Sequence, residues 1–439
     1  MYRNVINDFA LWYEEGHNKI LYVKGAYGVG KTWAVKDFAT AFFADLKYID
    51  CSKNHAFKDI ICRTIDDDND EDDVSIETKI SDVDFILEQH FGNQSNEDCL
   101  LVFDEIQTIE HGSEFFLAYK NAHPEITMCL IASSMQITEY EYVNGDVFHI
   151  VRMRPMTFEE YMIANKANPL LAAIENHKNM KLGSLEEKNI LLMLKDYMLT
   201  GGMPKVVHDF LKNRDYSVIR PLQIKIIEEY ESRIRNSFSF AMSQRCRRIW
   251  TSIPKQLSHD NKKFMYKYVE DNARAREYAD ATQLLCDMGF ARKLPRITSC
   301  EMPLEDNVDK KSFELFLIDH GLLRAILNLP VDESIELKDI FTDSNGSIAE
   351  QFLFQELSNK VGFLYYWISG ATARVPFVYE GEDAPVPVEI QFVPNKKAQA
   401  IKVFREKNPQ TEFSLKISLE QVYLDNKSLN IPAYGLWNM

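Results

Sequence analysis

Short apolar runs alternate with helix-like patterns over the first 160 residues of the chain. Five of these runs are strand candidates: Lys19–Lys24, Lys47–Cys51, Cys99–Asp104, Thr127–Ser133 and Val147–Val151. Strands that alternate with helices in this way form a parallel sheet with helices on both faces. Such strands are apolar along their whole length because both of their faces are buried. The pattern predicts an α/β domain over residues 1–160.

The pattern becomes helical after this domain and then changes again. Residues 161–235 contain the apolar helix-like run Leu191–Leu199, which ends at the strong turn signal Thr200–Pro204. We expect this stretch to form a helical lid or linker. Residues 236–330 contain short helices and an expected β-hairpin around Phe290–Leu294. A small helical unit that ends in a hairpin indicates a winged-helix variant of the helix-turn-helix.

Residues 331–439 predict a separate α+β domain. Its elements follow the order helix, three strands, helix, strand: Ser347–Asn359, Phe363–Ile368, Arg374–Tyr379, Val386–Phe392, Lys396–Lys407 and Glu412–Ile417. The sequence therefore predicts four parts in all, which is compatible with a chain of 439 residues.

Charge is distributed unevenly along the chain. The net charge is -16, which argues against a protein that coats nucleic acid along its whole surface. Ten acidic residues against one lysine lie between Asp66 and Asp84, and such a run is typical of a solvated, mobile loop. Fourteen Lys and Arg against six Asp and Glu lie between Arg233 and Cys300, so the expected winged-helix region is basic.

Cysteine usage and hydropathy bear on the compartment. The seven cysteines form no CxxC pair, which gives little support to a zinc site and suits a reducing cytoplasm. The N-terminal residues do not resemble a signal peptide. No apolar stretch approaches the roughly 20 residues of a membrane span. We therefore expect a cytoplasmic protein without a membrane partner.

The octapeptide Gly25-Ala26-Tyr27-Gly28-Val29-Gly30-Lys31-Thr32 is a complete P-loop between an apolar run and a helix-like segment. In that context its backbone N–H groups wrap the phosphates of a nucleotide, and glycine permits the required geometry. Lys31 would neutralise the β- and γ-phosphates, and the Thr32 hydroxyl would bind Mg²⁺. The alternative is a glycine-rich turn followed by a surface lysine. We expect ATP and Mg²⁺ as cofactors.

A second motif strengthens this expectation. The apolar run Cys99–Phe103 ends in Asp104 and Glu105. Asp104 has the character of a Walker B aspartate, which helps to hold Mg²⁺. Glu105 follows at the place where AAA-type enzymes carry the base that deprotonates the attacking water. The presence of Glu105 favours hydrolysis over binding alone.

Other polar residues are candidates for contacts with the nucleotide. Ser133 and Ser134 follow the fourth apolar run, where a hydroxyl can contact the γ-phosphate or simply cap a helix. Gln107 could contact the same region. Arg152 and Arg154 could face a phosphate, in the same chain or from a neighbouring subunit of a homo-oligomer. Surface salt bridges are the alternative for both arginines.

The succession of these motifs resembles a family of bacterial and archaeal AAA-type ATPases with a winged-helix segment and a C-terminal domain of unknown function. The resemblance covers nearly the whole chain and rests on Gly25–Thr32, Leu101–Gln107, Ile131–Ser134, Arg154–Tyr161, Gly201–Pro204, Ile253–Leu257, Ala273–Tyr278 and Phe316–Leu323. It implies an ATPase domain over 1–160, a lid over 161–235, a winged helix over 236–330 and a restriction-endonuclease-like domain over 331–439.

The resemblance also implies a metal-dependent nuclease site in that last domain, from which this sequence departs. The family pattern needs a helix glutamate, a strand aspartate and a strand Glu-x-Lys, because two carboxylates hold Mg²⁺ and a lysine positions water. Glu350 and Glu389 are present, but Pro376 replaces the aspartate and Gln391 replaces the lysine. We therefore expect an inactive nuclease-like domain that docks on nucleic acid or protein.

The basic region leaves two interpretations open. Its cationic residues are Arg233, Arg235, Arg245, Arg247, Arg248, Lys262, Lys263, Lys267, Arg274 and Arg276, and its interleaved aromatic residues are Phe238, Phe240, Trp250, Phe264, Tyr266, Tyr268 and Tyr278. Phosphate contacts from such a surface would give salt-sensitive DNA binding. Alternatively, the aromatic residues form a core, the cations pair with acids, and the region contacts a protein or serves as a scaffold.

Three functional hypotheses follow from the sequence. The first is a Mg²⁺-dependent ATPase whose nucleotide state moves the domains after residue 160. The second is a slow, nucleotide-gated switch that binds DNA or a partner protein with little turnover. The third is an ATP-regulated nuclease, which Pro376 and Gln391 disfavour.

Overall fold

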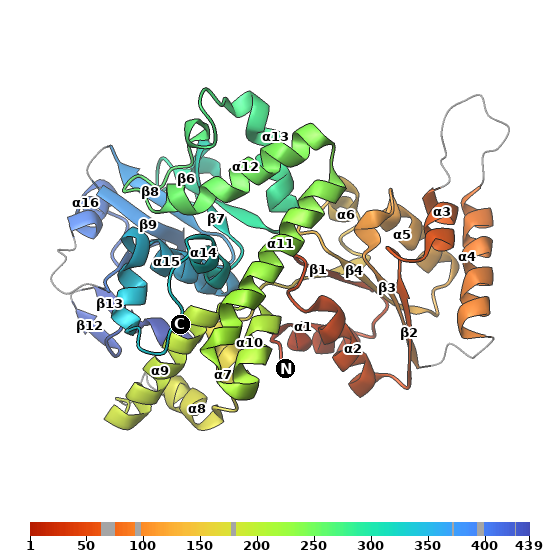
Figure 1. Ribbon diagram of the computed structural model, residues 1–439, viewed down its shortest axis with the longest axis horizontal. Helices are drawn as coiled ribbons and strands as arrows, with labels where there is room; N and C mark the ends of the chain where they lie inside the picture. Colours follow the sequence, from red (N-terminus) through yellow and green to blue (C-terminus); the bar gives the residue numbers. More distant parts are fainter. Residues whose placement is uncertain (63–74, 93–97, 177–180, 371–372, 393–398, 426) are drawn as a thin grey trace. The chain divides into compact units, whose positions relative to one another are not determined.

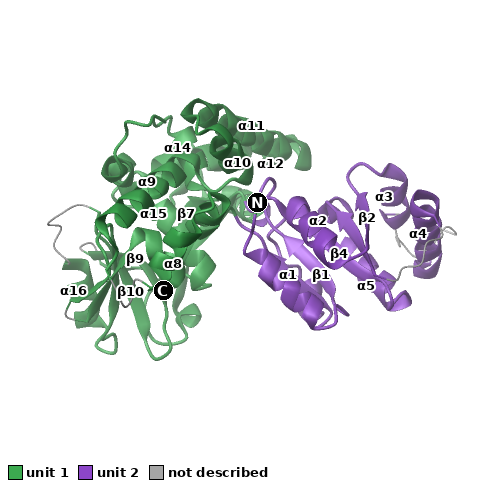
Figure 2. Ribbon diagram, turned by 90° about the horizontal axis from the view of Figure 1, so that it is seen from below, with its two compact units in different colours: residues 1, 155–286, 290–439 green, residues 2–154, 287–289 purple. Residues whose placement is uncertain are grey.

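The computed structural model describes residues 1–62, 75–92, 98–176, 181–370, 373–392, 399–425 and 427–439. Within these ranges the chain forms two compact units, which Figure 2 draws in different colours. Unit 2 consists of Tyr2–Arg154 and Asp287–Gly289, and unit 1 of Met1, Pro155–Cys286 and Phe290–Met439. The chain therefore leaves unit 1 after Cys286, contributes three residues to unit 2 and returns to unit 1.

Unit 2 is built on a parallel sheet that has five strands among the described residues, in the order β2-β3-β4-β1-β5 (Figure 1). The strands are β1 Ile20–Lys24, β2 Asp45–Asp50, β3 Cys99–Asp104, β4 Thr127–Ala132 and β5 Phe148–Arg152. β1 and β3 are buried along their whole length, as expected for strands with both faces covered. The predicted α/β class and all five strand candidates of this unit are confirmed.

Helices cover both faces of this sheet (Figure 1). They are α1 Val5–Glu14, α2 Lys31–Phe42, α3 His55–Cys62, α4 Ile76–Phe91, the 3₁₀ turn η1 Ile106–Thr108, α5 Gly112–Ala122 and α6 Glu139–Val143. On the side of α3 to α5, Phe103 packs between Phe57 and Phe116, with ring centroids 5.4 and 4.6 Å away. Phe9 of α1 packs against Phe38 of α2, with ring centroids 5.5 Å apart.

The acidic run that we expected to be a mobile loop divides into two parts. Asp66–Asp73 lies outside the described residues. The acids Glu77, Asp82 and Asp84 belong to α4, so the loop prediction is wrong for them. α4 forms because Ser75 caps its first turn and because the completely buried Val83 packs into the core of unit 2.

Unit 1 begins with helices. They are α7 Phe158–Ala164, α8 Asn168–Asn176, α9 Ser184–Thr200, α10 Pro204–Asn213, the 3₁₀ turn η2 Tyr216–Val218, α11 Ile219–Ser237, α12 Phe240–Leu257, the 3₁₀ turn η3 Tyr266–Tyr268 and α13 Ala275–Asp287. The predicted turn lies between α9 and α10. A Cβ on Gly201 would lie 2.3 Å from an oxygen of Asp319 and 2.8 Å from the Cα of Gly321, so this close approach requires glycine.

A second sheet continues unit 1, with eight strands among the described residues in the order β12-β13-β11-β10-β9-β8-β6-β7. The strands are β6 Ala291–Ile297, β7 Val308–Leu317, β8 Tyr365–Ser369, β9 Ala373–Glu380, β10 Pro385–Ile390, β11 Ser414–Ser418, β12 Tyr423–Asp425 and β13 Ser428–Pro432. The expected hairpin is present as the antiparallel pair β6–β7. β6 also pairs with β8, so one sheet joins this hairpin to strands of the C-terminal part.

The remaining helices of unit 1 are α14 His320–Ile326, α15 Leu337–Lys360 and α16 Gln399–Lys407, with the 3₁₀ turns η4 Leu304–Asn307 and η5 Ala433–Asn438. α15 is interrupted at Asp343–Gly346, where Ser344, Asn345 and Gly346 have positive φ angles. Its second part therefore begins at Ser347, where the sequence predicts a helix. The predicted order of helix, three strands, helix and strand is present in α15, β8 to β10, α16 and β11.

Candidate nucleotide-binding and hydrolysis site

The carboxyl ends of three neighbouring strands bring the predicted motifs of unit 2 together. β4 pairs with β1 on one side and with β3 on the other. The loop Gly25–Thr32 follows β1, Glu105 follows β3 and Ser133 follows β4. In open parallel sheets, ligands bind outside the carboxyl ends of the strands. The candidate site therefore lies at this edge of the unit 2 sheet.

The loop Gly25–Thr32 has the backbone geometry of a phosphate cradle. Gly28 and Gly30 have φ angles of 82° and 96°, in the left-handed region that favours glycine. α2 begins directly after Gly30, so the N-terminal amides and the positive dipole end of this helix lie at the loop. A Cβ on Gly25 would lie 2.3 Å from the Met153 carbonyl oxygen, so this position also requires glycine.

Lys31 is buried at the base of the loop, with 5% of the residue exposed. Its ammonium group donates to the carbonyl oxygens of Gly25 and Ala26, both at 2.9 Å, and to the Ser133 hydroxyl at 3.2 Å. The ammonium group of Lys31 thus lies between the loop and the end of β4, where the P-loop motif predicts phosphates.

Arg3 holds this loop from outside and was missed in the sequence. Its guanidinium donates to the carbonyl oxygen of Val29 at 2.5 Å and to that of Arg154 at 2.6 Å. Arg3 is almost completely buried. An arginine near the N-terminus belongs to no local motif, so nothing in the sequence indicated this contact.

The Asp104 carboxylate accepts hydrogen bonds at both oxygens. Oδ2 accepts from the Thr32 hydroxyl at 2.6 Å and from the Tyr48 hydroxyl at 2.8 Å, and Oδ1 accepts from the backbone amide of Glu105 at 2.8 Å. Burial and the negative charge of Asp104 raise the pKa of Tyr48 well above its ordinary value. Tyr48 therefore remains protonated and donates. The P-loop and the acidic end of β3 predict Thr32 and Asp104 as neighbours at Mg²⁺, whereas no sequence motif includes Tyr48.

Glu105 directly follows β3 in an uncommon backbone conformation. Its φ of 59° lies in the left-handed region, where a side chain costs energy. Its Oε1 accepts from the Ser133 hydroxyl at 3.0 Å, and its Oε2 accepts from the Gln107 amide. The Gln107 carbonyl oxygen in turn accepts from the Ser133 backbone amide at 2.9 Å. Three predicted residues, Glu105, Gln107 and Ser133, thus form one hydrogen-bonded group.

Ser134 and the two arginines do not join this group. The Ser134 hydroxyl donates to the carbonyl oxygen of Asp287 at 3.1 Å and accepts from the Gln136 amide at 3.2 Å. Arg152 is exposed. Burial, together with the nearby charge of Arg152, lowers the pKa of Arg154 to about 10, so its guanidinium remains charged at neutral pH. Their expected contacts with a nucleotide stay predictions.

A cavity of about 820 Å³ lies beside this group. Gln107 and Ser134 line it together with a buried ion pair, in which the Lys24 ammonium lies 2.5 Å from the Glu141 carboxylate. Ser113 donates to the other oxygen of Glu141 at 2.8 Å. Burial lowers the pKa of Lys24, although the hydrogen bond and the charge of Glu141 partly offset this effect.

The residues at the site fit Mg²⁺ with a nucleotide. Mg²⁺ prefers oxygen ligands and usually keeps several waters together with substrate phosphates, so one carboxylate and one hydroxyl suffice from the protein. Thr32 and Asp104 supply these oxygens side by side. Among the described residues no cluster of three or more His, Cys, Asp or Glu side chains could hold a metal on its own.

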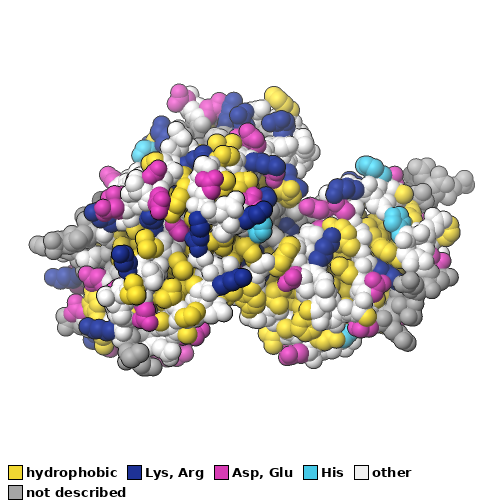
Figure 3. All heavy atoms as spheres, turned by 60° about the horizontal axis from the view of Figure 1, so that its bottom comes forward, with side chains coloured by type: hydrophobic (Ala, Val, Ile, Leu, Met, Phe, Trp, Pro, Cys, Tyr) yellow, Lys and Arg dark blue, Asp and Glu magenta, His cyan; other side chains and the backbone are white. Residues whose placement is uncertain are grey.

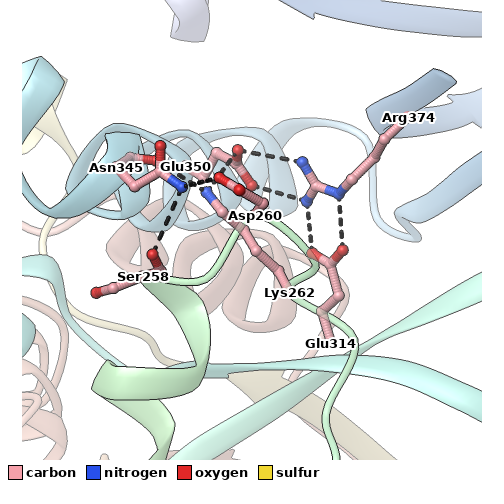
Figure 4. Close-up of polar contacts among 7 residues, drawn as sticks. All are labelled: Ser258, Asp260, Lys262, Glu314, Asn345, Glu350 and Arg374. Atoms are coloured by element: carbon pink, nitrogen blue, oxygen red, sulfur yellow. Dashed lines mark hydrogen bonds and ion pairs between the residues drawn. The ribbon is translucent and has the colours of Figure 1, made fainter. Parts of the chain in front are cut away.

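The polar cluster around Glu350 in unit 1 is shown in Figure 4. Arg374 of β9 lies between Glu314 and Glu350, 2.6 and 2.8 Å from their carboxylates. Lys262 lies 2.8 Å from the other oxygen of Glu350. Burial alone would raise the pKa of Glu350, but Arg374 and Lys262 lower it to about 2. The expected helix carboxylate of a nuclease site is thus neutralised by two protein cations.

The other positions of that expected nuclease site lie on two strands. Pro376 lies in β9 and Glu389 in β10, and Gln391 directly follows β10. The backbone amide of Gln391 donates to the Ile417 carbonyl at 2.9 Å. Neither Pro376 nor Gln391 supplies the aspartate or lysine that the family pattern requires, so the absence of activity stays our prediction.

Several cations of the basic region contact acids. Lys262 is buried against Glu350, Arg248 forms an ion pair with Glu270, and Arg247 lies 3.8 Å from Glu231. On the face drawn in Figure 3, Lys and Arg side chains are interspersed with Asp and Glu rather than gathered into one patch. The aromatic residues Trp250, Phe264 and Tyr278 are buried, whereas Phe240 is 81% exposed. Trp250, Phe264 and Tyr278 thus pack as the interpretation with an aromatic core expects, whereas Phe240 does not, and DNA binding stays a prediction.

Comparison with known families agrees with the geometry of unit 2. Residues 17–162 match the family described as "AAA domain", and residues 192–333 match a "Domain of unknown function (DUF8612)". The first match, with the five-stranded parallel sheet, identifies the N-terminal part as a P-loop ATPase domain of AAA type and supports ATP binding by it. The predicted winged-helix and nuclease-like character of unit 1 is not shown by either match.

Three similar solved structures are distant from this chain in sequence and in fold. The Walker-type ATPase paby2304 of Pyrococcus abyssi is 13% identical, with 74% of this chain and 96% of that chain covered at a TM-score of 0.41. PCH-2 of C. elegans is 13% identical, with 47% and 59% covered at 0.30. The Pif1 helicase of Candida albicans is 9% identical, with 44% and 47% covered at 0.23. At these TM-scores none of the three bears on function.

No curated protein matches the chain. Among the helices that the structure describes, none combines the length and apolar character that crossing a bilayer requires.

Proposed function

We propose that the chain is a Mg²⁺-dependent ATPase whose nucleotide site lies at the carboxyl edge of the unit 2 sheet. The observation that carries this proposal is the 2.6 Å hydrogen bond from the Thr32 hydroxyl to Asp104. It brings the last residue of the P-loop to the acid that ends β3, although 72 positions separate them in the chain.

In this proposal the P-loop residues Gly25 to Thr32 bind the phosphates. Their backbone amides and the N-terminus of α2 stabilise the negative charge. Lys31 is already directed into the loop, where it donates to two carbonyl oxygens. Phosphate oxygens would accept from the same ammonium and form stronger, charge-assisted hydrogen bonds.

Thr32 and Asp104 would hold Mg²⁺ with their hydroxyl and carboxylate oxygens. When bound, the ion supplies positive charge that stabilises the phosphoryl group during transfer. The Glu105 amide donates to Asp104 Oδ1 and holds this oxygen in place. The carboxylate can therefore keep its orientation when the Thr32 hydroxyl oxygen binds Mg²⁺.

Glu105 would accept the proton of the attacking water as a general base. Ser133 contacts both Lys31 and Glu105, so its hydroxyl can report whether a γ-phosphate is present between them. Both Glu105 oxygens already accept hydrogen bonds, from Ser133 and from Gln107. Because each carboxylate oxygen can accept two hydrogen bonds, Glu105 can orient a water while it keeps both donors. A slow, nucleotide-gated switch stays the alternative, and the turnover rate separates the two.

We further propose that the nucleotide state of unit 2 controls docking by unit 1. An ATP-regulated nuclease remains the least supported alternative, because Arg374 and Lys262 already neutralise Glu350. Docking on a protein fits the mixed charges of unit 1. Docking on DNA would rest on fewer cations than the sequence suggested, chiefly the exposed Arg235, Lys267 and Arg274.

Titration of a fluorescent ATP analogue tests the proposed site. Lys31→Ala should weaken ATP binding by about 10–100-fold, because it removes several charge-assisted hydrogen bonds. Lys120→Ala is the matched control, since the buried Lys120 also donates to two carbonyl oxygens, at 2.8 and 2.6 Å, away from the proposed site. Equal ATP affinity of the Lys31→Ala variant and the wild type would refute the site.

A single-turnover hydrolysis experiment tests the base. Glu105→Gln should keep ATP bound and lower the rate by about 10²–10⁴-fold, which is the usual contribution of a general base. Glu110→Gln, an exposed change five residues along the chain, is the control. A fast Glu105→Gln variant would remove Glu105 from this role, and a wild type that binds ATP with almost no turnover would select the switch.

A further inference from the structure

We infer that Tyr48 is a positioning residue of the nucleotide site: its hydroxyl orients the Asp104 carboxylate for Mg²⁺. The inference rests on the proposed function, and it assigns to β2 a part in the site that the P-loop and β3 motifs do not include.

The register of two parallel strands places Tyr48 beside Asp104. In the β2–β3 pair Tyr48 lies opposite Val102, and Asp50 lies opposite Asp104. Because side chains alternate between the faces of a sheet, Tyr48 and Asp104 share one face, two positions apart along the register. A tyrosine side chain is long enough to span this diagonal, and its hydroxyl lies 2.8 Å from Asp104 Oδ2.

Tyr48 supplies a donor that comes from outside the nucleotide-binding loop. Of the three donors on Asp104, the Thr32 hydroxyl belongs to the P-loop and the Glu105 amide belongs to the segment that carries the base. Both segments are expected to adjust when a nucleotide binds. Tyr48 lies in the regular part of β2 and can hold the carboxylate plane constant through such adjustments.

A contact from α2 fixes the tyrosine ring. The Lys36 ammonium lies 3.6 Å from the centre of the Tyr48 ring, a favourable cation–π distance. α2 also begins with Lys31 and Thr32, so one helix carries the phosphate-binding residues and contacts the residue that orients Asp104. The half-buried ring is therefore held between α2 and β3, on the same side as the predicted metal ligands.

The orientation of the Asp104 carboxylate should affect the affinity for Mg²⁺ more than the affinity for Ca²⁺. Mg²⁺ requires nearly ideal octahedral geometry, whereas Ca²⁺ accepts flexible coordination with more ligands. A carboxylate that loses one of its donors can rotate, and this rotation penalises Mg²⁺ more than Ca²⁺. A purely structural role of Tyr48 would instead lower stability and affect both metals equally.

The test compares Tyr48→Phe with the wild type in titrations of a fluorescent ATP analogue, first without divalent metal, then with increasing Mg²⁺ or Ca²⁺. We expect about a tenfold rise in the Mg²⁺ concentration at half-saturation, from the loss of one hydrogen bond to a charged group. The Ca²⁺ midpoint and the metal-free affinity should change less than twofold. Tyr119→Phe is the matched control, because the Tyr119 hydroxyl donates to Asp84 at 2.7 Å elsewhere in unit 2.

A double-mutant cycle separates positioning from folding. In an Asp104→Asn background, Tyr48→Phe should add nothing to the change in the Mg²⁺ midpoint, because its effect acts through Asp104. An additive effect, an unchanged Mg²⁺ midpoint or an equal shift for Ca²⁺ would overturn the inference and leave the proposed ATPase intact. A wild type that binds no ATP with Mg²⁺ would instead refute the proposed function, and the inference with it.

Discussion

Glu356 predicts an unusual pH dependence for the stability of unit 1. It lies in α15 and is 5% exposed, and its Oε1 accepts from the Phe158 amide at 3.1 Å. The Tyr197 hydroxyl lies 3.0 Å from the same oxygen and 2.6 Å from the Met156 carbonyl oxygen. One hydroxyl proton cannot serve both acceptors. A protonated Glu356 carboxyl resolves this conflict, because it can donate to the Tyr197 oxygen.

Burial is the main cause that raises the pKa of Glu356, to about 8 from an ordinary value of 4.5, and the nearby charge of Glu160 adds to it. Between these two pH values the folded state holds a proton that the unfolded state has lost. The free energy of unfolding therefore falls as the pH rises, by about 1.4 kcal/mol per pH unit for one proton. The stabilisation is complete below pH 4.5 and is lost as the pH approaches 8.

Glu356→Gln isolates this contribution, because the amide does not titrate and its oxygen still accepts from the Phe158 amide. Between pH 5 and pH 7 the variant should gain roughly 3 kcal/mol relative to the wild type. Urea unfolding followed by tryptophan fluorescence measures it, since Trp250, Trp367 and Trp437 all belong to unit 1. Glu333→Gln, at an exposed position of unit 1, is the control. Parallel stability curves for the wild type and Glu356→Gln would refute the reasoning.

Three other predictions concern separate parts of the chain. Glu350→Gln should destabilise unit 1 by about 3–5 kcal/mol near pH 7, because it removes the carboxylate that the buried Lys262 contacts and one of the two that Arg374 contacts. Since the pKa of Glu350 is lowered to about 2, this deficit should shrink as the pH falls from 4.5 towards 2; a constant deficit in acid unfolding curves would contradict it. Gly289→Val should lower the unfolding temperature of unit 2 and weaken ATP binding. Gly289 has a φ of 73°, and a Cβ there would lie 2.8 Å from Met135 and 3.1 Å from Ala26. Calorimetry with and without ATP measures both effects, and unchanged values would refute the contact. Serine substitutions at the exposed cations Arg235, Lys267 and Arg274 should weaken DNA binding at low salt by at least about tenfold. A wild type that shows no salt-sensitive DNA binding in fluorescence anisotropy would refute the DNA proposal.

The sheet of unit 2 could be predicted because its strands carry their own signal. A strand covered on both faces, such as β3, is a continuous apolar run, and its functional acids Asp104 and Glu105 stand at its end. β12 and β13 of unit 1 were missed for the opposite reason. Tyr423–Asp425 is three residues long and largely exposed, and Ser428–Pro432 contains Asn430 and a terminal proline. Ser428–Pro432 does alternate polar and apolar residues, but this run is only five residues long. Tyr423–Asp425 is too short to show any alternation.

The candidate site could be predicted only as far as local motifs extend. The P-loop and the Asp104–Glu105 pair are short patterns, and their place at strand ends follows from the parallel sheet. Tyr48 and Arg3 act through neighbours that are far away in the sequence, so their contacts depend on strand order and register. The charge balance around Glu350 was also hidden, because Lys262 and Arg374 are separated from it by long stretches of chain.

The short return of the chain at Asp287–Gly289 sets a limit on where the ATPase unit can be cut. The Asp287 carbonyl oxygen accepts from the Met135 amide at 2.6 Å and from the Ser134 hydroxyl at 3.1 Å. A fragment that ends at Arg154 would lose this acceptor, so the donors on Ser134 and Met135, one and two residues beyond Ser133, would lose this partner. The match to the AAA family ends at residue 162, well before Asp287. An excised AAA domain would therefore lack part of unit 2, and its ATP binding would not represent that of the whole chain.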